Sequence, residues 1–354
     1  MAKTKIAIIG TGTIFKEHIA AYQNNPDVEV YALCDINEEK VKAAGKEYGV
    51  ARVFSDMHEM LKLEEIDAVS ICTWNVAHAP CAIAALNAKK HVLCEKPMAL
   101  NAQQAREMKQ AADRNGKLLM IGFVRRFGND CDIVKDFIDN GHFGEVYYAK
   151  AAYMRRQGNP GGWFGDKARS GGGPLIDLGV HVIDLARYLG GNPKPVSAYG
   201  VTFHKLGDPR HLKGKKGYHS SDRSDSDVCD VEDMVSALVR FDNGMALQFE
   251  ASYTLNLEKE SGTIELFGTK AGAKLDPELE IYTQLNDYQA NVQLTAPTAL
   301  SFDGLFQREI DHFVSCVREN IPCRAPAQDG ITLMTILDAI YESAETGHEV
   351  LIKG

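Results

Sequence analysis

The sequence lacks the features of several protein classes. It has eight cysteines but no CxxC pair, so in a chain of 354 residues we expect reduced thiols and not a disulfide scaffold. No apolar run approaches the roughly 18 residues that a membrane-spanning helix needs, and we expect no leader at the N-terminus. There is no excess of positive charge. The net charge of −9 argues against nucleic acid or an anionic membrane as the main partner. These absences predict a cytoplasmic protein.

The composition is that of an ordinary globular protein, with 45% apolar and 25% charged residues. The length favours two domains. Across residues 1–123, apolar runs alternate with helical patterns, and each run is followed by a glycine, an acid or a capping residue. Strands and helices that alternate at this spacing predict an α/β domain of the Rossmann type, with a doubly wound parallel sheet.

Residues 124–354 have a different pattern and predict an α+β domain. Strand-like runs alternate in polarity, and Asp242-Asn243-Gly244 between two of them is a strong hairpin signal. Two helices are expected near residues 306–319 and 330–346. Residues 205–230 are polar and too long for a plain connection, so we interpret them as a lid or a mobile insertion.

The first candidate site is a dinucleotide cradle at the N-terminus. Gly10-Thr-Gly12 lies where a strand turns into a helix, and glycine there lets the backbone approach a pyrophosphate. Asp35 ends the next strand, where its carboxylate can bind ribose hydroxyls and would repel a 2′-phosphate. This pattern favours NAD over NADP. Phe15 stands in place of the third glycine of the fingerprint. This departure bears on the local packing of the helix against the strand more than on cofactor binding.

The second candidate site combines a lysine, a carboxylate and an imidazole. Lys96 follows a strand whose carboxyl end would face a ligand. Asp177 and His181 lie four residues apart after the glycines 171–173, so they share a face if that stretch is helical. Three readings stay open for this pair: a local contact, two ligands of a metal, or a general base with its orienting acid. No third ligand stands at metal-binding spacing nearby.

The chain resembles the Gfo/Idh/MocA oxidoreductase family along nearly its whole length. The stretches that carry the resemblance are AIIGTGTIFKEHIAAY, SICTWNVAHAP, HVLCEKPMALN, GFVRRF, GGGPLIDLGVHVIDLARYLGG and VEDMVSALVRFDNGMALQFEASY. The resemblance implies an NAD-binding Rossmann domain (1–123) and a substrate-binding and oligomerisation domain (124–354) with an open, mostly antiparallel sheet. It also implies that the closing helices can pack back near the Rossmann domain. A homodimer or homotetramer is expected.

The resemblance also assigns roles to residues, which we carry over position by position. The catalytic positions are Lys96, Asp177 and His181. The expected cofactor contacts are Gly10, Gly12, Thr13, Ile14, Asp35, Thr73, Asn75, His78, Glu95 and Lys96. The expected substrate contacts are Lys96, Arg126, Tyr153, Trp163, Asp177 and His181.

These residues predict hydride transfer between a secondary carbinol of a sugar, glycoside or cyclitol and the nicotinamide. His181 would be the general base, Lys96 would stabilise the reacting oxygen, and Asp177 would orient His181 or substrate. No metal is needed for this chemistry. The alternatives are an NAD-recycling glycosidase of the same family, a non-enzymatic NAD-sensing regulatory protein, and a metal-dependent hydrolase that uses Asp177 and His181.

Overall fold

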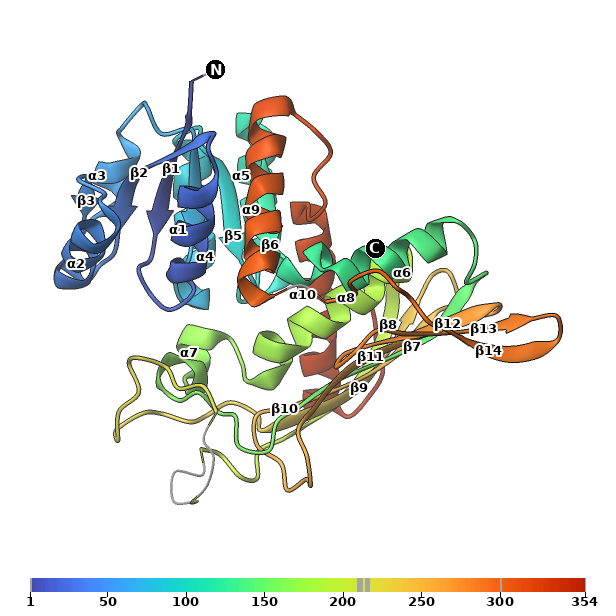
Figure 1. The fold of residues 1–354 in the computed structure, drawn as a ribbon. Helices are drawn as coiled ribbons and strands as arrows, with labels where there is room; N and C mark the ends of the chain where they lie inside the picture. Colours follow the sequence, from blue (N-terminus) through green and yellow to red (C-terminus); the bar gives the residue numbers. More distant parts are fainter. Residues whose placement is uncertain (1, 209–212, 214–216, 300, 354) are drawn as a thin grey trace. The chain divides into compact units, whose positions relative to one another are not determined.

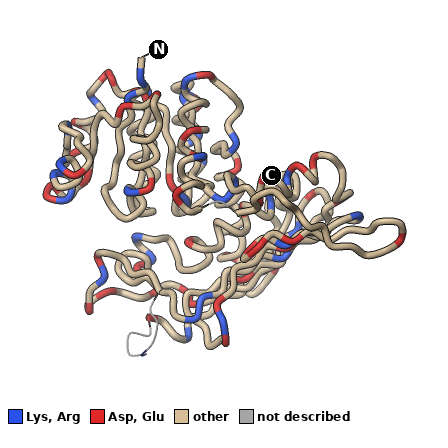
Figure 2. Tube along the Cα trace, in the orientation of Figure 1, with Lys and Arg blue, Asp and Glu red and all other residues tan. Residues whose placement is uncertain are grey.

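The computed structural model describes residues 2–208, 213, 217–299 and 301–353. The chain forms two compact units, one of residues 1–127 with 301–331, the other of residues 128–300 with 332–354 (Figure 1). Each unit is described by itself. Within each unit, the described basic and acidic residues are interspersed along the chain trace (Figure 2).

The first unit contains a six-stranded, fully parallel sheet in the order β3-β2-β1-β4-β5-β6. Its strands are β1 (Thr4–Ile9), β2 (Val28–Cys34), β3 (Val53–Phe54), β4 (Ala68–Ile71), β5 (His91–Glu95) and β6 (Leu119–Gly122). Its helices are α1 (Phe15–Asn24), α2 (Glu38–Tyr48), α3 (Met57–Leu61), α4 (Asn75–Asn87), α5 (Ala102–Asn115), the short η1 (Val124–Phe127) and α9 (Phe302–Glu319). The predicted doubly wound sheet is confirmed.

Local signals in the sequence set the ends of two helices. Asn37 caps α2 by accepting the Lys40 N–H, and Gly49 ends that helix at φ 72°. Asn101 caps α5 by accepting the Gln104 N–H at 3.0 Å, and the Gln104 side chain in turn accepts the Leu100 N–H. These capping contacts, between residues three or four positions apart, stabilise the N-terminal ends of α2 and α5.

Residues 301–331 follow the second domain in the chain but pack in the first unit. Helix α9 lies against α1, and the Gln307 side chain donates to the Ala21 carbonyl at 3.1 Å (Figure 1). Beyond α9, the Ala325 carbonyl accepts the Ile121 N–H of β6 at 3.0 Å. The first compact unit is therefore larger than the span 1–123 predicted for the Rossmann domain.

The second unit is built on a nine-stranded mixed sheet in the order β14-β13-β12-β11-β7-β10-β9-β8-β15. Only β7 and β10 pair in parallel among these neighbours, so the sheet is mostly antiparallel, as predicted. The strands are β7 (Val146–Met154), β8 (Pro195–Phe203), β9 (Met234–Phe241), β10 (Ala246–Ser252), β11 (Ser261–Gly268), β12 (Ala271–Leu275), β13 (Glu280–Leu285), β14 (Tyr288–Val292) and β15 (Val350–Leu351).

The helices of this part of the chain are α6 (Asn129–Asp139), η2 (Gly162–Gly165), α7 (Lys167–Ser170), the π-helical turn η3 (Leu175–Gly179) and α8 (Val180–Leu189). Helix α10 (Ala327–Thr346) begins in the first unit and ends in the second. The predicted hairpin at Asp242–Gly244 joins β9 and β10, whose inner residues Leu247 and Phe249 are fully buried. Sequence reasoning missed β12, β13 and β14. The alternation of apolar and polar residues along these strands is weak, so the sequence pattern does not mark them as strands.

Candidate active site

The turn after β1 has the geometry of a nucleotide cradle. Gly10 adopts φ +93°, and a Cβ there would lie 2.6 Å from the Cys72 carbonyl oxygen, so only glycine fits. A Cβ at Gly12 would meet no atom within 4 Å, which leaves open space before α1. Ile14 stands at the N-cap position of α1 and has no side-chain acceptor to offer the first N–H groups. The turn can therefore accept an anionic group at the helix N-terminus.

Asp35 lies at the end of β2 beside this turn, as predicted. Its Oδ2 accepts the backbone N–H and the hydroxyl of Thr11 at 2.7 and 2.8 Å, and its Oδ1 accepts the Asn37 N–H at 2.8 Å. A carboxylate offers about four acceptor positions, so it still has room for a ribose hydroxyl. The contacts to Thr11 hold the acid against the glycine turn.

Phe15 is accommodated where the fingerprint has a third glycine. Its ring is 2% exposed and packs edge-on against Tyr48 of α2, with ring centroids 5.5 Å apart. Helix α2 in turn approaches β3 closely at Gly45, where a Cβ would lie 2.5 Å from Val53 Cγ1. The aromatic ring thus fills the helix-to-helix space and leaves the turn itself unchanged.

The loops after β4 and β5 are joined through His78. This ring is buried, with Nδ1 2.7 Å from the Pro97 carbonyl and Nε2 3.1 Å from the Thr73 carbonyl. Burial lowers the pKa of His78, so the ring is neutral and donates to one of the two oxygens. Asn75, the first residue of α4, is also buried. His78 thus positions the turn that carries the half-buried Lys96, a role that sequence reasoning did not assign.

Glu95 takes part in a buried network that sequence reasoning missed. Its Oε1 lies 2.7 Å from His18 Nε2, and its Oε2 accepts the backbone N–H of Lys96 at 3.1 Å. His18 Nδ1 lies 2.9 Å from the hydroxyl of Ser70, which Tyr22 also contacts. The side chain of Glu95, a predicted cofactor contact, is therefore held in place by the His18 imidazole. The only sequence signal was a histidine at the inner face of a helix, which is usually a core residue.

In the second unit, Asp177 and His181 lie on one face as expected. Asp177 sits in the π-helical turn η3 and His181 in the first turn of α8. Between Gly172 and Arg187 they are the only two residues that are not buried. A π turn places residues four and five apart nearly in line, so the pair projects to the same side.

A remote acid holds the start of this helical segment. Glu232, 3% exposed, accepts the N–H groups of Gly173 and Leu175 at 2.9 and 3.1 Å and the Tyr341 hydroxyl at 3.0 Å. Burial raises its pKa, and these hydrogen bonds partly oppose that shift. A Cβ at Gly172 or Gly173 would overlap Tyr341 or Glu232, which explains the glycine run. Glu232 lies in one of the stretches that resemble the family, VEDMVSALVRF. Its role could not be predicted there, because it depends on a contact with Gly173, which is 59 positions away in the sequence.

Asp177 interacts with two residues that directly follow strands of the sheet, Tyr253 after β10 and Arg155 after β7. Its Oδ2 accepts the hydroxyl of Tyr253 at 2.9 Å, and Tyr253 is 1% exposed. Burial, followed by the charge of Asp177, raises the pKa of Tyr253 well above its usual range, so this phenol stays a donor. Burial lowers the pKa of Arg155, but the charge of Asp177 acts together with Tyr153 and Tyr253 in the opposite direction, and the net shift is upward. Arg155 also lies over the Tyr153 ring, 5.1 Å from its centroid.

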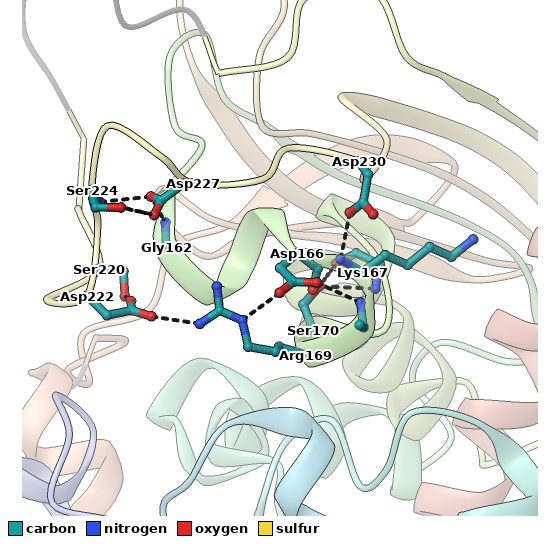
Figure 3. Close-up of polar contacts among 12 residues, drawn as sticks. Gly162, Asp166, Lys167, Arg169, Ser170, Ser220, Asp222, Ser224, Asp227 and Asp230 are labelled. Atoms are coloured by element: carbon teal, nitrogen blue, oxygen red, sulfur yellow. Dashed lines mark hydrogen bonds and ion pairs between the residues drawn. The ribbon is translucent and has the colours of Figure 1, made fainter. Parts of the chain in front are cut away.

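Trp163 lies on a segment tied to the polar insertion. Its ring stacks on Phe164 with centroids 3.9 Å apart. The N–H of the adjacent Gly162 donates to Asp227 at 2.6 Å, and Arg169 bridges Asp166 and Asp222 (Figure 3). The N–H of Lys167 donates to Asp230 at 2.7 Å (Figure 3). The described part of 205–230 thus anchors the loop that carries Trp163. Residues 209–212 and 214–216 of the predicted lid lie outside the described residues.

Arg126 is one of the predicted substrate contacts. Its side chain is fully buried in the first unit. There Nη1 donates to Asp329 Oδ2 at 2.8 Å and to the Arg324 carbonyl at 2.7 Å. A buried arginine with a paired carboxylate ties the 301–331 segment to the Rossmann unit. Its contact with substrate stays a prediction.

The hypothesis that Asp177 and His181 bind a metal ion lacks a third ligand among the described residues. Across the described ranges, two groups of at least three potential metal ligands lie close together: His312, Cys316 and Cys323, and His18, Glu95 and Glu309. Neither group contains Asp177 or His181. No helix in the described part of the chain is long and apolar enough to cross a membrane.

A parallel sheet with a glycine turn, and an acid after the next strand, is the arrangement of a dinucleotide-binding domain, and comparisons with known proteins agree. The model described as "Oxidoreductase family, NAD-binding Rossmann fold" matches residues 4–123, and "Oxidoreductase family, C-terminal alpha/beta domain" matches residues 135–352. The chain belongs to the Gfo/Idh/MocA oxidoreductase family.

Two curated relatives match nearly the whole chain. The D-glucoside 3-dehydrogenase of Escherichia coli (strain K12) is 35% identical over 98% of this chain and 97% of its own length. The levoglucosan dehydrogenase of Pseudarthrobacter phenanthrenivorans is 29% identical over 97% of each chain. A solved structure of levoglucosan dehydrogenase with NADH and L-sorbose has a TM-score of 0.86, with 25% identity and full coverage of both chains. The chain is thus an NAD-dependent dehydrogenase by family and fold.

Proposed function

We propose that this enzyme oxidises a ring secondary alcohol of a glucoside or a related pyranose, with position 3 of a glucoside as the first candidate. The observation that carries the proposal is the near full-length similarity to D-glucoside 3-dehydrogenase, together with the retained Lys96, Asp177 and His181. Similarity to levoglucosan dehydrogenase, whose name also denotes a pyranose derivative, supports the same substrate class.

In the proposed mechanism, the protein residues move the proton and stabilise charge. When bound, NAD⁺ supplies the acceptor for the hydride. His181 takes the proton of the reacting hydroxyl, and Lys96 donates a hydrogen bond to the oxygen as negative charge develops on it. Asp177, fixed by Tyr253, orients His181 or a neighbouring substrate hydroxyl. Tyr153 and Trp163 are proposed to line the sugar, and Arg155 joins them because of its place beside Asp177.

The cofactor contacts are proposed as Gly10, Gly12, Thr13, Ile14, Asp35, Thr73 and Asn75, with Glu95 and Lys96 nearer the reacting end. His78 acts through the two loops that it joins. The open space at Gly12 and the ribose-side acid fit a dinucleotide without a 2′-phosphate. We propose NAD in preference to NADP on this basis.

The wider setting is proposed from the same features. Residues 1–123 are proposed to bind NAD, and residues 124–354 to bind substrate and to mediate assembly. A homodimer or homotetramer is proposed to form through the outer face of the nine-stranded sheet, and a cytoplasmic location is proposed because NAD is an intracellular cofactor. Neither nucleic acid nor a membrane is expected as a partner.

The test is a screen of NAD⁺ reduction against glucosides, free glucose, levoglucosan, inositols and uronates, with product analysis by NMR. The proposal expects NADH to accumulate in proportion to a keto product of a glucoside or another pyranose. Release of free sugar from a glycoside without net NADH would favour the NAD-recycling glycosidase. If NAD⁺ binds but no member of the panel reacts, a sensing protein is favoured. Loss of activity on chelation that metal restores would support the hydrolase.

A further inference from the structure

The end of α9 gathers two thiols and an imidazole outside the site described above. His312 and Cys316 are one helical turn apart, and Cys323 follows after the helix ends at Asn320 (φ 56°). One ligand atom of each residue lies within 4.8 Å of the other two. Cys316 is buried, whereas His312 and Cys323 are partly exposed. Two cysteines that are seven positions apart in sequence thus meet at the surface of the first unit.

The hydrogen bonds make the two thiols unequal. Hydrogen bonding from Cys316 lowers the pKa of Cys323 against the effect of burial, and His312 and the Ala325 N–H act in the same direction. The same contact with Cys323, with burial, raises the pKa of Cys316. Cys323, which is partly exposed, is therefore the sulfur that an oxidant can reach, and the buried Cys316 is the sulfur beside it. A reactive thiolate beside a second thiol is the arrangement of a redox-responsive pair.

We propose that Cys323 and Cys316 form a reversible disulfide when the protein meets a peroxide. The Cys323 thiolate attacks the peroxide, forming a sulfenic acid and releasing hydroxide. Cys316 then attacks that sulfur, which forms the disulfide and releases water. Two thiols are oxidised to one disulfide, one peroxide is reduced, and a dithiol reductant reverses the step.

The surroundings of His312 argue for this reading over a metal site. The Arg324 backbone N–H donates to His312 Nε2 at 2.9 Å, and Cys316 Sγ lies 3.3 Å from the same nitrogen. The lone pair of Nε2, the nitrogen beside Cys316, already accepts a hydrogen bond. A metal would have to displace Arg324, whose carbonyl is in turn bound by Arg126.

The disulfide would connect two elements of the first unit. Cys323 precedes Ala325, whose carbonyl accepts the Ile121 N–H of β6, and Pro326 forms a bridge with Met120. Cys316 belongs to α9. Oxidation would therefore tie the last turn of α9 to the segment that extends the β6 edge. This inference does not depend on the proposed substrate or on the catalytic residues.

The full-length protein is treated with hydrogen peroxide, blocked with iodoacetamide and digested with trypsin. We expect the peptide of residues 309–318 joined to that of residues 319–324, with a mass about 2 Da below the sum of the free thiol peptides. At pH 7, iodoacetamide is expected to alkylate Cys323 about tenfold faster than the more exposed Cys229. Cys229→Ser is the matched control and should leave the cross-link unchanged.

Single substitutions test the roles of the two cysteines separately. Cys316→Ser should stop the reaction at a sulfenic acid on Cys323 that dimedone traps, and Cys323→Ser should prevent both products. His312→Gln should slow the alkylation of Cys323. If peroxide oxidises Cys229 first and gives no peptide cross-link in the wild type, the proposal is wrong. Stoichiometric zinc in the purified protein, lost in both serine variants, would also overturn it in favour of a metal site.

Discussion

At the scale of single residues, Asp35 is proposed to bind the cofactor, and its carboxylate is already held in place by the protein. Three hydrogen bonds from Thr11 and Asn37 hold its carboxylate at the glycine turn. A side chain that is already ordered loses little further entropy when it binds a ribose. A carboxylate also repels a 2′-phosphate, so in the proposed role one residue would serve both affinity and discrimination.

Asp35→Ala should therefore change the choice of cofactor. We expect KM for NAD⁺ to rise about tenfold, the effect of losing roughly 1.4 kcal/mol of hydrogen bonding to a charged group, while KM for NADP⁺ falls relative to it. Steady-state kinetics with both cofactors measures this. Glu38→Ala, an exposed acid in the first turn of α2, is the control and should change neither value. A wild type that prefers NADP⁺ would refute the assignment.

Lys96 and His181 are expected to act on the reacting oxygen. Lys96→Ala and His181→Ala should each reduce turnover by about 10²- to 10⁴-fold, with NAD⁺ binding retained. Single-turnover kinetics and fluorescence titration with NADH separate the two effects. The exposed Lys89→Ala is the matched control for lost positive charge. Near-normal turnover in either active-site variant would contradict its role.

At the scale of elements, Glu232, which is distant in sequence, stabilises the start of the helical segment that contains Asp177. Glu232 accepts two buried backbone N–H groups and the partly buried hydroxyl of Tyr341. Glu232→Ala should lower the free energy of unfolding by about 2–4 kcal/mol, because it leaves those donors without an acceptor. Glu232→Gln keeps one acceptor oxygen and should lose less. Denaturant unfolding measures both, with the exposed Glu278→Ala as control. Equal stability of the alanine variant and the wild type would refute this account.

A second buried acid predicts a dependence of stability on pH. Among the described residues, both carboxylate oxygens of Glu309 on α9 are buried without a hydrogen-bond partner. Burial, then the charges of Glu95 and Cys323, raises the pKa of Glu309 well above its usual range. The folded protein therefore keeps a proton that the unfolded chain loses above about pH 4.5. Stability from this group is present below that pH and declines as the pH rises.

Glu309→Gln removes this titration. At pH 8 we expect the variant to be more stable than the wild type by about 1–3 kcal/mol, with the difference shrinking toward pH 4.5. Urea unfolding across that range measures it, and the exposed Glu319→Gln should show no such trend. A difference that is constant with pH would show that Glu309 is ionised in the folded protein.

At the scale of the whole molecule, the nine-stranded sheet leaves apolar side chains on its outer face. Tyr199 of β8 and Leu238 of β9 lie directly opposite each other and are 46% and 43% exposed. Paired aromatic and aliphatic residues in that position are suited to self-association.

Tyr199→Lys combined with Leu238→Lys should weaken assembly at least about 100-fold, as expected for loss of central interface residues. Light scattering coupled to size-exclusion chromatography measures the mass. Leu285→Lys, 61% exposed on β13, is the control and should keep the wild-type mass. An unchanged mass in the double variant would place the interface elsewhere.

The sequence by itself determined the features that rest on short-range physics. The alternation of strands and helices, the caps at Asn37 and Asn101, the Gly10 turn and the shared face of Asp177 and His181 all follow from neighbours a few residues apart. The resemblance added the catalytic positions. Only the tertiary structure decided which partners these residues have. Glu232 reaches Gly173, Tyr253 reaches Asp177, His18 reaches Glu95, and Arg126 turns inward to Asp329. Such contacts depend on packing between distant segments, which local propensity does not encode.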